Sequence, residues 1–152
     1  MSYKVSPIPA GYNSLTPYFI VKDAAKAIAF YKEAFNAIEV TRAEHGGKVC
    51  HAEITIGDSK LMLADEFLEM GCKSPQAFGG TPVSLCLYVE DVDSVVAKAV
   101  AAGATITQPL ENKFYGDRNA MLEDPFGHKW CVATHIEDVS EEEVKARMAK
   151  LF

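Results

Sequence analysis

A histidine and a glutamate lie two residues apart in the stretch VCHAEITI, residues 49–56. The stretch alternates apolar and polar residues, as a half-buried β-strand does, so His51 and Glu53 should project from one face. Side chains two apart on a strand are separated by about 6.6–7 Å, so one substrate could contact both. An imidazole can act as a general base near neutral pH, and a desolvated glutamate can do so with a raised pKa. The structural alternative is a polar pair in which Glu53 bonds Tyr18 or Lys60.

A second group of chemically capable residues lies in FYGDRNAMLEDPFGHKW, residues 114–130. Arg118 could fork onto a ligand carboxylate or phosphate through two parallel hydrogen bonds. The alternative is an ion pair between Arg118 and either Asp117 or Glu123 that fixes the loop. Trp130, the only tryptophan of the chain, should lie under a helix as part of the core.

The four cysteines are Cys50, Cys72, Cys86 and Cys131, and they show no CxxC spacing. Three of them fall inside apolar alternating runs, so we expect buried, inert thiols in a reducing compartment. No spacing joins Cys86 or Cys131 to His51, so a cysteine nucleophile is not predicted. Serine-triad motifs and phosphate-binding glycine loops are also missing from the sequence.

Composition and charge argue against several classes of function. The chain has 152 residues, of which 49% are hydrophobic and 24% charged, and its formal net charge is −6. An acidic chain lacks the basic face that sequence-independent binding to nucleic acid needs. No apolar run approaches the roughly 20 residues of a membrane span, and the N-terminal stretch lacks the apolar segment of a secretory signal. We therefore expect a cytoplasmic protein with neither nucleic acid nor membrane as a partner.

The elements that must position these residues occur twice along the chain. The stretch FIVKDAAKAIAFYKEAFNA, residues 19–37, is followed 68 positions later by the similar LYVEDVDSVVAKAVAAGAT, residues 87–105. Each copy reads as a strand, an aspartate suited to cap a helix, and a helix. Three strand-like runs follow each helix, so each copy has the order βαβββ.

The predicted fold class is therefore α+β. Because one helix covers only one face of a four-stranded sheet, two tandem βαβββ modules should form an eight-stranded curved sheet around a groove, followed by a C-terminal helix. That helix should begin with a capping box made by Ser140 and Glu143. The expected bounds within one domain, 1–152, are about 15–66 for module one, 67–81 for a glycine-rich connector, 82–135 for module two and 141–152 for the helix.

Strand pairing places further side chains on the face of His51 and Glu53. The dipeptide Gly57-Asp58 is a good two-residue hairpin turn, and it fixes the register of the strands on either side. Opposite partners share a face, so their side chains should lie together. The expected pairs are Thr55–Lys60, Glu53–Met62 and His51–Ala64, and the first strands of the two modules add Thr16, Tyr18 and Ile20 and Ser84, Cys86 and Tyr88.

The paired modules resemble a known superfamily. The segments TPYFIVKDAAKAIAFYKEAF, HAEITIGDSKLMLADE, SLCLYVEDVDSVVAKAVAAGAT and GDRNAMLEDPFGHKWCVATH look like the PhnB-like branch of the vicinal oxygen chelate superfamily, also called the glyoxalase/bleomycin resistance/dioxygenase superfamily. The resemblance runs from Thr16 to His135. It implies a groove between the modules, and it implies that Cys131 and Ala133 of the last strand also face that groove.

The resemblance also implies where a metal ion would bind. Metal-dependent members hold a divalent ion with four residues, typically His or Glu, one from the first and one from the last strand of each module. Imidazoles and carboxylates offset the dehydration of Ni²⁺ or Zn²⁺, whereas hydroxyls and a thioether do not. We therefore predict no divalent metal and no other cofactor, with a shifted soft-metal site from His51, Met62, Cys86 and Cys131 as the alternative. The four corresponding positions here are Thr16, Met62, Ser84 and Cys131, none of which is His, Asp or Glu.

The functional prediction is a PhnB-like protein that binds a small molecule in the groove between its modules, is a homodimer, and has no assigned reaction. Two alternatives remain: a metal-dependent lyase, isomerase or dioxygenase of the same superfamily, and a resistance protein that sequesters an antibiotic. The candidate catalytic residues are His51 and Glu53. The expected ligand-binding residues are Thr16, Tyr18, Met62, Ser84, Cys86, Tyr88, Tyr115, Arg118 and Cys131.

Overall fold

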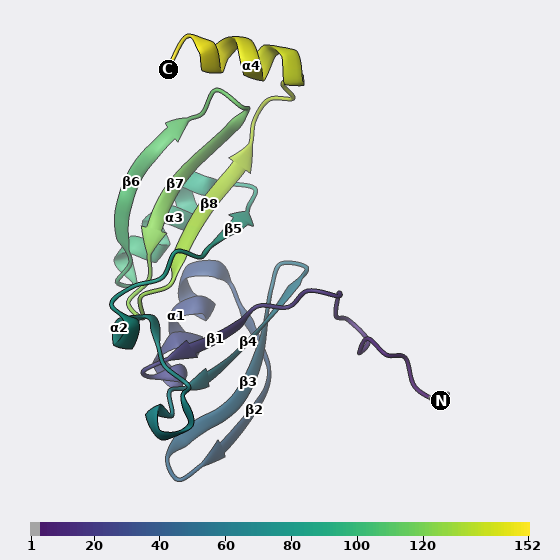
Figure 1. Ribbon diagram of the computed structural model, residues 1–152, viewed down its shortest axis with the longest axis vertical. Coiled ribbons are helices and arrows are strands. Elements are labelled where there is room, and N and C mark those ends of the chain that lie inside the picture. The colour runs from purple at the N-terminus through teal and green to yellow at the C-terminus, as the bar shows by residue number, and fades with distance from the viewer. Residues whose placement is uncertain (1–3) are drawn as a thin grey trace. The chain divides into compact units, whose positions relative to one another are not determined.

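The computed structural model describes residues 4–152, and the chain divides between Gly80 and Thr81 into two compact units (Figure 1). Each unit has one four-stranded sheet, and one long helix packs against that sheet. The predicted α+β class and the tandem βαβββ order are confirmed. The eight strands belong to two separate four-stranded sheets and not to one continuous sheet.

The sheet of the first unit has the strand order β1-β4-β3-β2. Strand β1 runs parallel to β4, and the other neighbours are antiparallel. The predicted pairs Thr55–Lys60 and Glu53–Met62 are present, and the ladder ends at Ala52–Leu63, one position before the third predicted pair. The elements of this unit are β1 (Tyr18–Val21), α1 (Ala24–Phe35), β2 (Ile38–His45), β3 (Lys48–Ile56), β4 (Ser59–Asp65), the 3₁₀ helix η1 (Leu68–Met70) and α2 (Pro75–Phe78).

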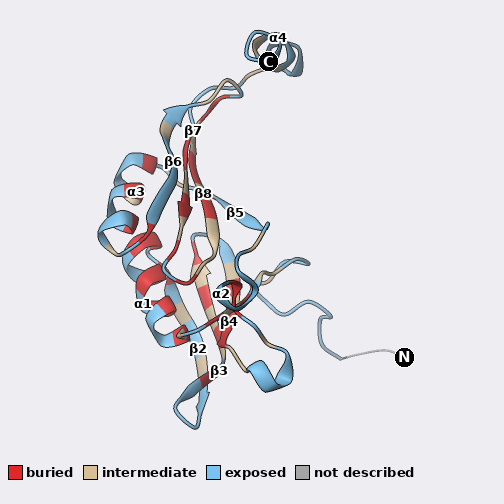
Figure 2. Cartoon of the chain, turned by 60° about the vertical axis from the view of Figure 1, so that its left-hand side comes forward, coloured by how far each residue is buried: buried red, intermediate tan, exposed pale blue. Residues whose placement is uncertain are grey.

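Helix α1 follows a capping aspartate, as the sequence pattern predicts. Asp23 caps its N-terminus, because the carboxylate accepts a hydrogen bond of 3.1 Å from the Lys26 amide. The helix ends at Asn36, whose φ of 56° places it in the left-handed region. Ile28 and Tyr31 of this helix are fully buried, and Figure 2 shows buried residues in red along α1. Each buried large apolar side chain contributes roughly 1.5–3 kcal/mol, so this burial holds the unit together.

Strand β3 departs from the predicted alternation at Cys50. Alternation places Cys50 on the buried face with Ala52, yet Cys50 is exposed. The ladder with β2 shifts register at this point, since Ala43 pairs with His51 whereas Glu44 pairs with Val49. Cys50 is therefore the extra residue of a β-bulge, and Val49 takes the buried place.

The expectation of buried thiols is wrong for all four cysteines. Cys50 and Cys86 are exposed, and Cys72 and Cys131 are half-buried. For Cys86 and Cys131 the physical reason is that their strands are covered by a helix on the other face, where their neighbours Leu87 and Val132 lie. These thiols are therefore accessible to reagents.

The sheet of the second unit repeats the first arrangement with the order β5-β8-β7-β6. Strand β5 is parallel to β8, and the other neighbours are antiparallel. Trp130 lies in the core as predicted, with 2% of its surface exposed, and its indole N–H donates to Asp124 at 2.9 Å. The elements are β5 (Ser84–Tyr88), α3 (Val92–Ala101), β6 (Thr105–Asn112), β7 (Asp117–Glu123), β8 (Lys129–His135) and α4 (Glu141–Ala149).

The C-terminal helix α4 begins with one half of the predicted capping box. The Ser140 hydroxyl accepts a hydrogen bond of 3.2 Å from the Glu143 amide. The Glu143 carboxylate instead accepts from the Arg147 guanidinium at 3.0 Å, and that guanidinium also donates to Glu137. Among residues 4–152, no helix is long and apolar enough to cross a membrane.

In each unit, a side chain of the last strand ties the sheet to the helix of its own unit. Asp65 of β4 accepts hydrogen bonds of 2.7 Å from the amides of Ala24 and Val49, and it is 8% exposed. Thr134 of β8 accepts from the Val92 amide at 2.9 Å and donates to the Val89 carbonyl at 2.8 Å. A free amide at each helix N-terminus is thus satisfied from the sheet.

We expect Asp65→Ala to lower the free energy of unfolding by roughly 2–5 kcal/mol, because it leaves two buried amides without an acceptor. Urea denaturation measures the loss. The control is Asp58→Ala in the exposed β3–β4 turn, which should change stability by about 0.5 kcal/mol or less. Equal effects of the two substitutions would show that Asp65 does not join helix and sheet as described.

Candidate functional site

One face of each sheet, here called the helix-free face, points away from the helix of its own unit. On β3, Ala52 and Ile54 are buried on the helix side, whereas His51, Glu53 and Thr55 are half-buried on the other. This is the division that strand alternation predicts. On this strand, the helix-free face therefore carries the polar side chains.

In the first unit, three side chains form a hydrogen-bonded chain on the helix-free face. The Tyr18 hydroxyl lies 2.9 Å from Nδ1 of His51, and Nε2 of His51 lies 2.7 Å from Oε2 of Glu53. A carboxylate only accepts, so Nε2 carries a proton and donates to Glu53. In the neutral imidazole, Nδ1 then accepts from the Tyr18 hydroxyl.

The partner of Glu53, His51, is neither of the two partners expected for it in the structural alternative. Glu53 bonds neither Tyr18 nor Lys60, because His51 lies between the first pair and Lys60 donates to Thr55 at 2.7 Å. Burial and the nearby Cys72 thiol raise the pKa of Tyr18, so its hydroxyl keeps its proton near neutral pH. The arrangement is that of a base oriented by a carboxylate, with Nδ1 as the basic nitrogen.

In the second unit, a buried carboxylate organises the corresponding face. Asp117 is 5% exposed, and it accepts a hydrogen bond of 2.7 Å from the Tyr88 hydroxyl and one of 2.8 Å from Nδ1 of His135. Nε2 of His135 lies 2.7 Å from the Asp138 carboxylate. Both ring nitrogens face acceptors, so the charged imidazolium is favoured.

Two pKa values follow from this network. The hydrogen bond to Asp117, together with burial, raises the pKa of Tyr88 to about 12. The hydrogen bonds that His135 donates to Asp117 and, to a smaller extent, to Asp138 raise the pKa of His135 above its ordinary value. Tyr88 is therefore a hydrogen-bond donor at neutral pH, and His135 is a cation over a wider pH range than a free histidine.

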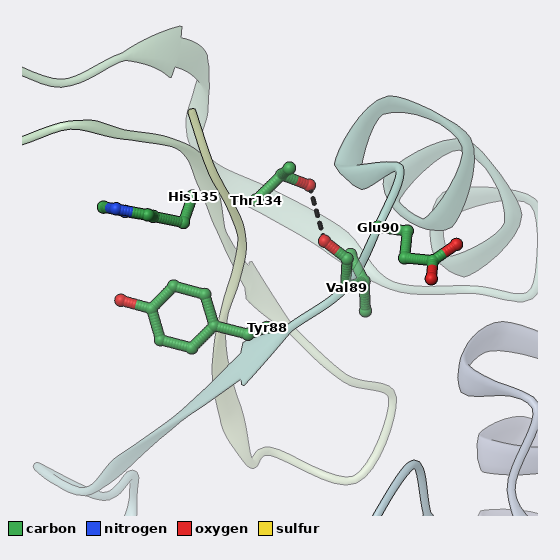
Figure 3. Close-up of a pocket in the computed structure, with 5 residues that line it drawn as sticks. All are labelled: Tyr88, Val89, Glu90, Thr134 and His135. Atoms are coloured by element: carbon green, nitrogen blue, oxygen red, sulfur yellow. Dashed lines mark hydrogen bonds between the residues drawn. The ribbon is translucent and has the colours of Figure 1, made fainter. Parts of the chain in front are cut away.

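A hollow of about 450 Å³, open to solvent, lies beside this network. Figure 3 shows the rings of Tyr88 and His135 extending in the same direction, whereas the Thr134 hydroxyl turns the other way to the Val89 carbonyl. The volume falls in the range of small-molecule sites, although the hollow is shallow and exposed. Its lining residues are Tyr88, Val89, Glu90, Thr134 and His135.

Arg118 lies apart from these groups. Its guanidinium forks onto the Asp93 carboxylate of α3, with bonds of 2.8 and 2.9 Å, and also donates to Asn112. The predicted loop-fixing partners, Asp117 and Glu123, are therefore wrong, because β7 presents Arg118 to the helix side of the sheet. The structure does not bring Arg118 together with the helix-free residues, and its ligand-binding role stays a prediction.

The other predicted site residues divide between the two units. In the first, Met62 pairs with Tyr18 across β1 and β4, and the half-buried Thr16 precedes β1. In the second, the Tyr115 hydroxyl accepts from the Asn119 amide at 2.8 Å. The remaining predicted residues, Ser84, Cys86, Tyr88 and Cys131, lie on β5 and β8.

Sequence reasoning missed the role of Asp117 as acceptor and missed His135 altogether. The signal for His135 was present, because alternation from Cys131 through Ala133 reaches His135 on the same face. The strand register places His135 beside Asp117, since the two residues are direct partners on β8 and β7. The hydrogen bond from Tyr88 depends on side-chain reach across two strands, which the pattern alone does not fix.

Comparison with known proteins gives consistent matches. A sequence profile of the Glyoxalase/Bleomycin resistance protein/Dioxygenase superfamily matches residues 12–132. An uncharacterised protein of Mycobacterium bovis, Mb0911c, is 41% identical over 140 residues, which are 90% of this chain and 92% of that protein. The X-ray structure of the Arabidopsis thaliana gene product At5g48480 is 29% identical with a TM-score of 0.65, over 80% of this chain and 98% of that one. A PhnB protein from Bacillus cereus is similar in fold alone, with 22% identity and a TM-score of 0.62 over 80% of this chain and 99% of that one.

The residues at the four positions where the resemblance puts metal ligands do not fit a divalent ion. Thr16 and Ser84 offer neutral hydroxyls, and Met62 offers a thioether. Burial, together with the neighbouring Cys86, raises the pKa of the Cys131 thiol to about 11, so it is protonated at neutral pH. Across residues 4–152, no three His, Cys, Asp or Glu side chains gather in a way that could hold a metal. Ni²⁺ and Zn²⁺ sites need basic ligands that these positions lack.

We expect the pKa of His135, followed by NMR titration of its ring protons, to lie above the ordinary value of 6.5. Asp117→Asn should lower it more than Asp138→Asn, because Asp117 is the larger cause. The raised value means that His135 stabilises the fold fully below pH 6.5 and that this contribution is lost as pH rises through the folded-state pKa. A wild-type value at or below 6.5 would contradict the described network.

Proposed function

The chain belongs to the Glyoxalase/Bleomycin resistance protein/Dioxygenase superfamily, and we propose that it binds a small organic molecule by hydrogen bonds and ring stacking on the helix-free sheet faces. In this proposal, no divalent metal ion takes part. The donor groups at Thr16, Met62, Ser84 and Cys131 support this, because two neutral hydroxyls, a thioether and at most one thiolate do not repay the dehydration of such an ion.

The chain Tyr18–His51–Glu53 is the observation that carries the proposal. Glu53 holds the Nε2 proton of His51, so Nδ1 is an acceptor. The Tyr18 hydroxyl occupies it in the structure, and a ligand hydroxyl could take that place. Tyr18 is 48% exposed and Tyr88 is 59% exposed, so both rings can stack on a planar ligand. A planar molecule with an acidic hydroxyl, such as a phenol or an enol, fits these groups.

His51 and Glu53 are also the proposed catalytic pair, if a reaction takes place. A ligand hydroxyl that replaces the Tyr18 hydroxyl at Nδ1 could transfer its proton there, and Glu53 would stabilise the imidazolium that forms. The reaction that would follow is not assigned. Four further points stay predictions from the sequence. They are membership of the PhnB-like branch, a cytoplasmic location, a homodimer and a groove between the modules.

A binding screen tests the proposal. We expect at least one compound from a set of phenols and enols to shift amide signals of β1 and β3 in two-dimensional NMR of EDTA-treated protein. His51→Gln should lower the binding affinity for that compound by roughly tenfold, because one hydrogen bond to the ligand is lost. The matched control is His45→Gln at the exposed end of β2, which should leave binding unchanged.

Two outcomes would contradict the proposal. One is a screen in which no compound shifts the signals of either helix-free face. The other is binding that EDTA abolishes and that added Ni²⁺ or Zn²⁺ restores, since this would return the metal-dependent alternative.

A further inference from the structure

Three sulfur-bearing side chains form a row across the sheet of the second unit. Cys86 of β5 is the direct partner of Cys131 of β8, and Cys131 is also the direct partner of Met121 of β7. Direct partners on neighbouring strands project from the same face. The three residues therefore lie side by side on the helix-free face.

The first unit lacks such a row at its corresponding positions. The direct partners there are Tyr18 of β1, Met62 of β4 and Glu53 of β3. The concentration of sulfur is therefore a property of the second unit and does not follow from the shared strand plan.

The thiols of this row are free and reachable. Cys86 is exposed, and Cys131 is half-buried, as is Met121. A cysteine pair of this kind has three ordinary uses: core packing, a disulfide, or capture of a soft ion. The exposure of Cys86 argues against core packing.

The strand geometry favours an ion between the sulfurs over a direct bond. Neighbouring strands lie about 4.7–4.9 Å apart, and side chains of direct partners stand roughly parallel to each other. A disulfide needs its two Cβ atoms at about 3.5–4.5 Å, which is shorter than this spacing. Two metal–sulfur bonds of about 2.3 Å each span up to about 4.6 Å, which matches it.

We propose that Cys86, Cys131 and Met121 form a binding site for a soft monovalent cation, with Cu(I) as the chemical type. Thiolates and a thioether are the ligands that Cu(I) prefers, and they discriminate against harder divalent ions. The two thiols lose one proton each to solvent as the ion binds, so a complex of two thiolates and one Cu(I) carries one negative charge. A soft ion can remove such protons, because coordination deprotonates a thiol outright.

This site uses none of Tyr18, His51 and Glu53, the residues that carry the proposed small-molecule function. It uses Cys131 but none of Thr16, Met62 and Ser84, so it is not the divalent position of the metal-dependent superfamily members. The two proposals can therefore fail separately.

The test is an anaerobic titration of the protein against Cu(I) held by the coloured chelator bicinchoninate. The working protein is the Cys50→Ser/Cys72→Ser variant, which keeps only the proposed pair of thiols. We expect it to withdraw one equivalent of Cu(I), as wild type does. Adding Cys86→Ser to this variant should lower the affinity by at least about a hundredfold, and adding Met121→Leu by about tenfold.

Retention of the copper by the chelator in the presence of the working protein would overturn the proposal, and so would equal copper uptake with and without Cys86→Ser. Unchanged affinity in Met121→Leu would remove Met121 from the site. Circular dichroism of each variant checks folding, and Cys86→Ser is chosen because the residue is exposed. A working protein that loses two hydrogen masses in air while binding no Cu(I) anaerobically would assign the pair to disulfide chemistry instead.

Discussion

In each unit a single helix packs against a sheet of four strands, and this constraint governs the rest of the structure. One helix can shield only one face, so strand alternation sends apolar side chains to that face and leaves the other for different chemistry. In β3, Ala52 and Ile54 are fully buried under α1, whereas His51 and Glu53, which alternate with them, are only half-buried. Function is thereby separated from stability within a single strand.

The two units use this plan with different side chains. In the first, an imidazole lies between a phenol and a carboxylate, and Glu53 leaves Nδ1 of His51 as the basic atom. In the second, the carboxylate of Asp117 lies in the middle, and it favours the charged form of His135. One face thus offers a base and the other a cation, and hydrogen bonds organise both groups.

Local sequence signals are sufficient to predict the helices and strands, but they do not predict the contacts between these elements. The bounds of α1 follow from Asp23 and the apolar period, and the β3–β4 register follows from the Gly57-Asp58 turn. The bulge at Cys50 arises from the pairing of two strands, which no residue type marks. Arg118 binds Asp93 because β7 and α3 pack together. The two residues are far apart in the sequence, so local patterns do not predict this contact. His135 lies on the face that strand alternation gives to Cys131 and Ala133, so its place follows from the sequence pattern.

The central claim is that hydrogen-bonding side chains, and not a divalent metal, define the functional faces. Elemental analysis of protein purified without an affinity tag tests this most directly. The account predicts under about 0.1 equivalent of nickel, zinc, manganese, iron and cobalt together. A stoichiometric amount of any of these ions, lost on Cys131→Ser or Met62→Leu, would contradict it.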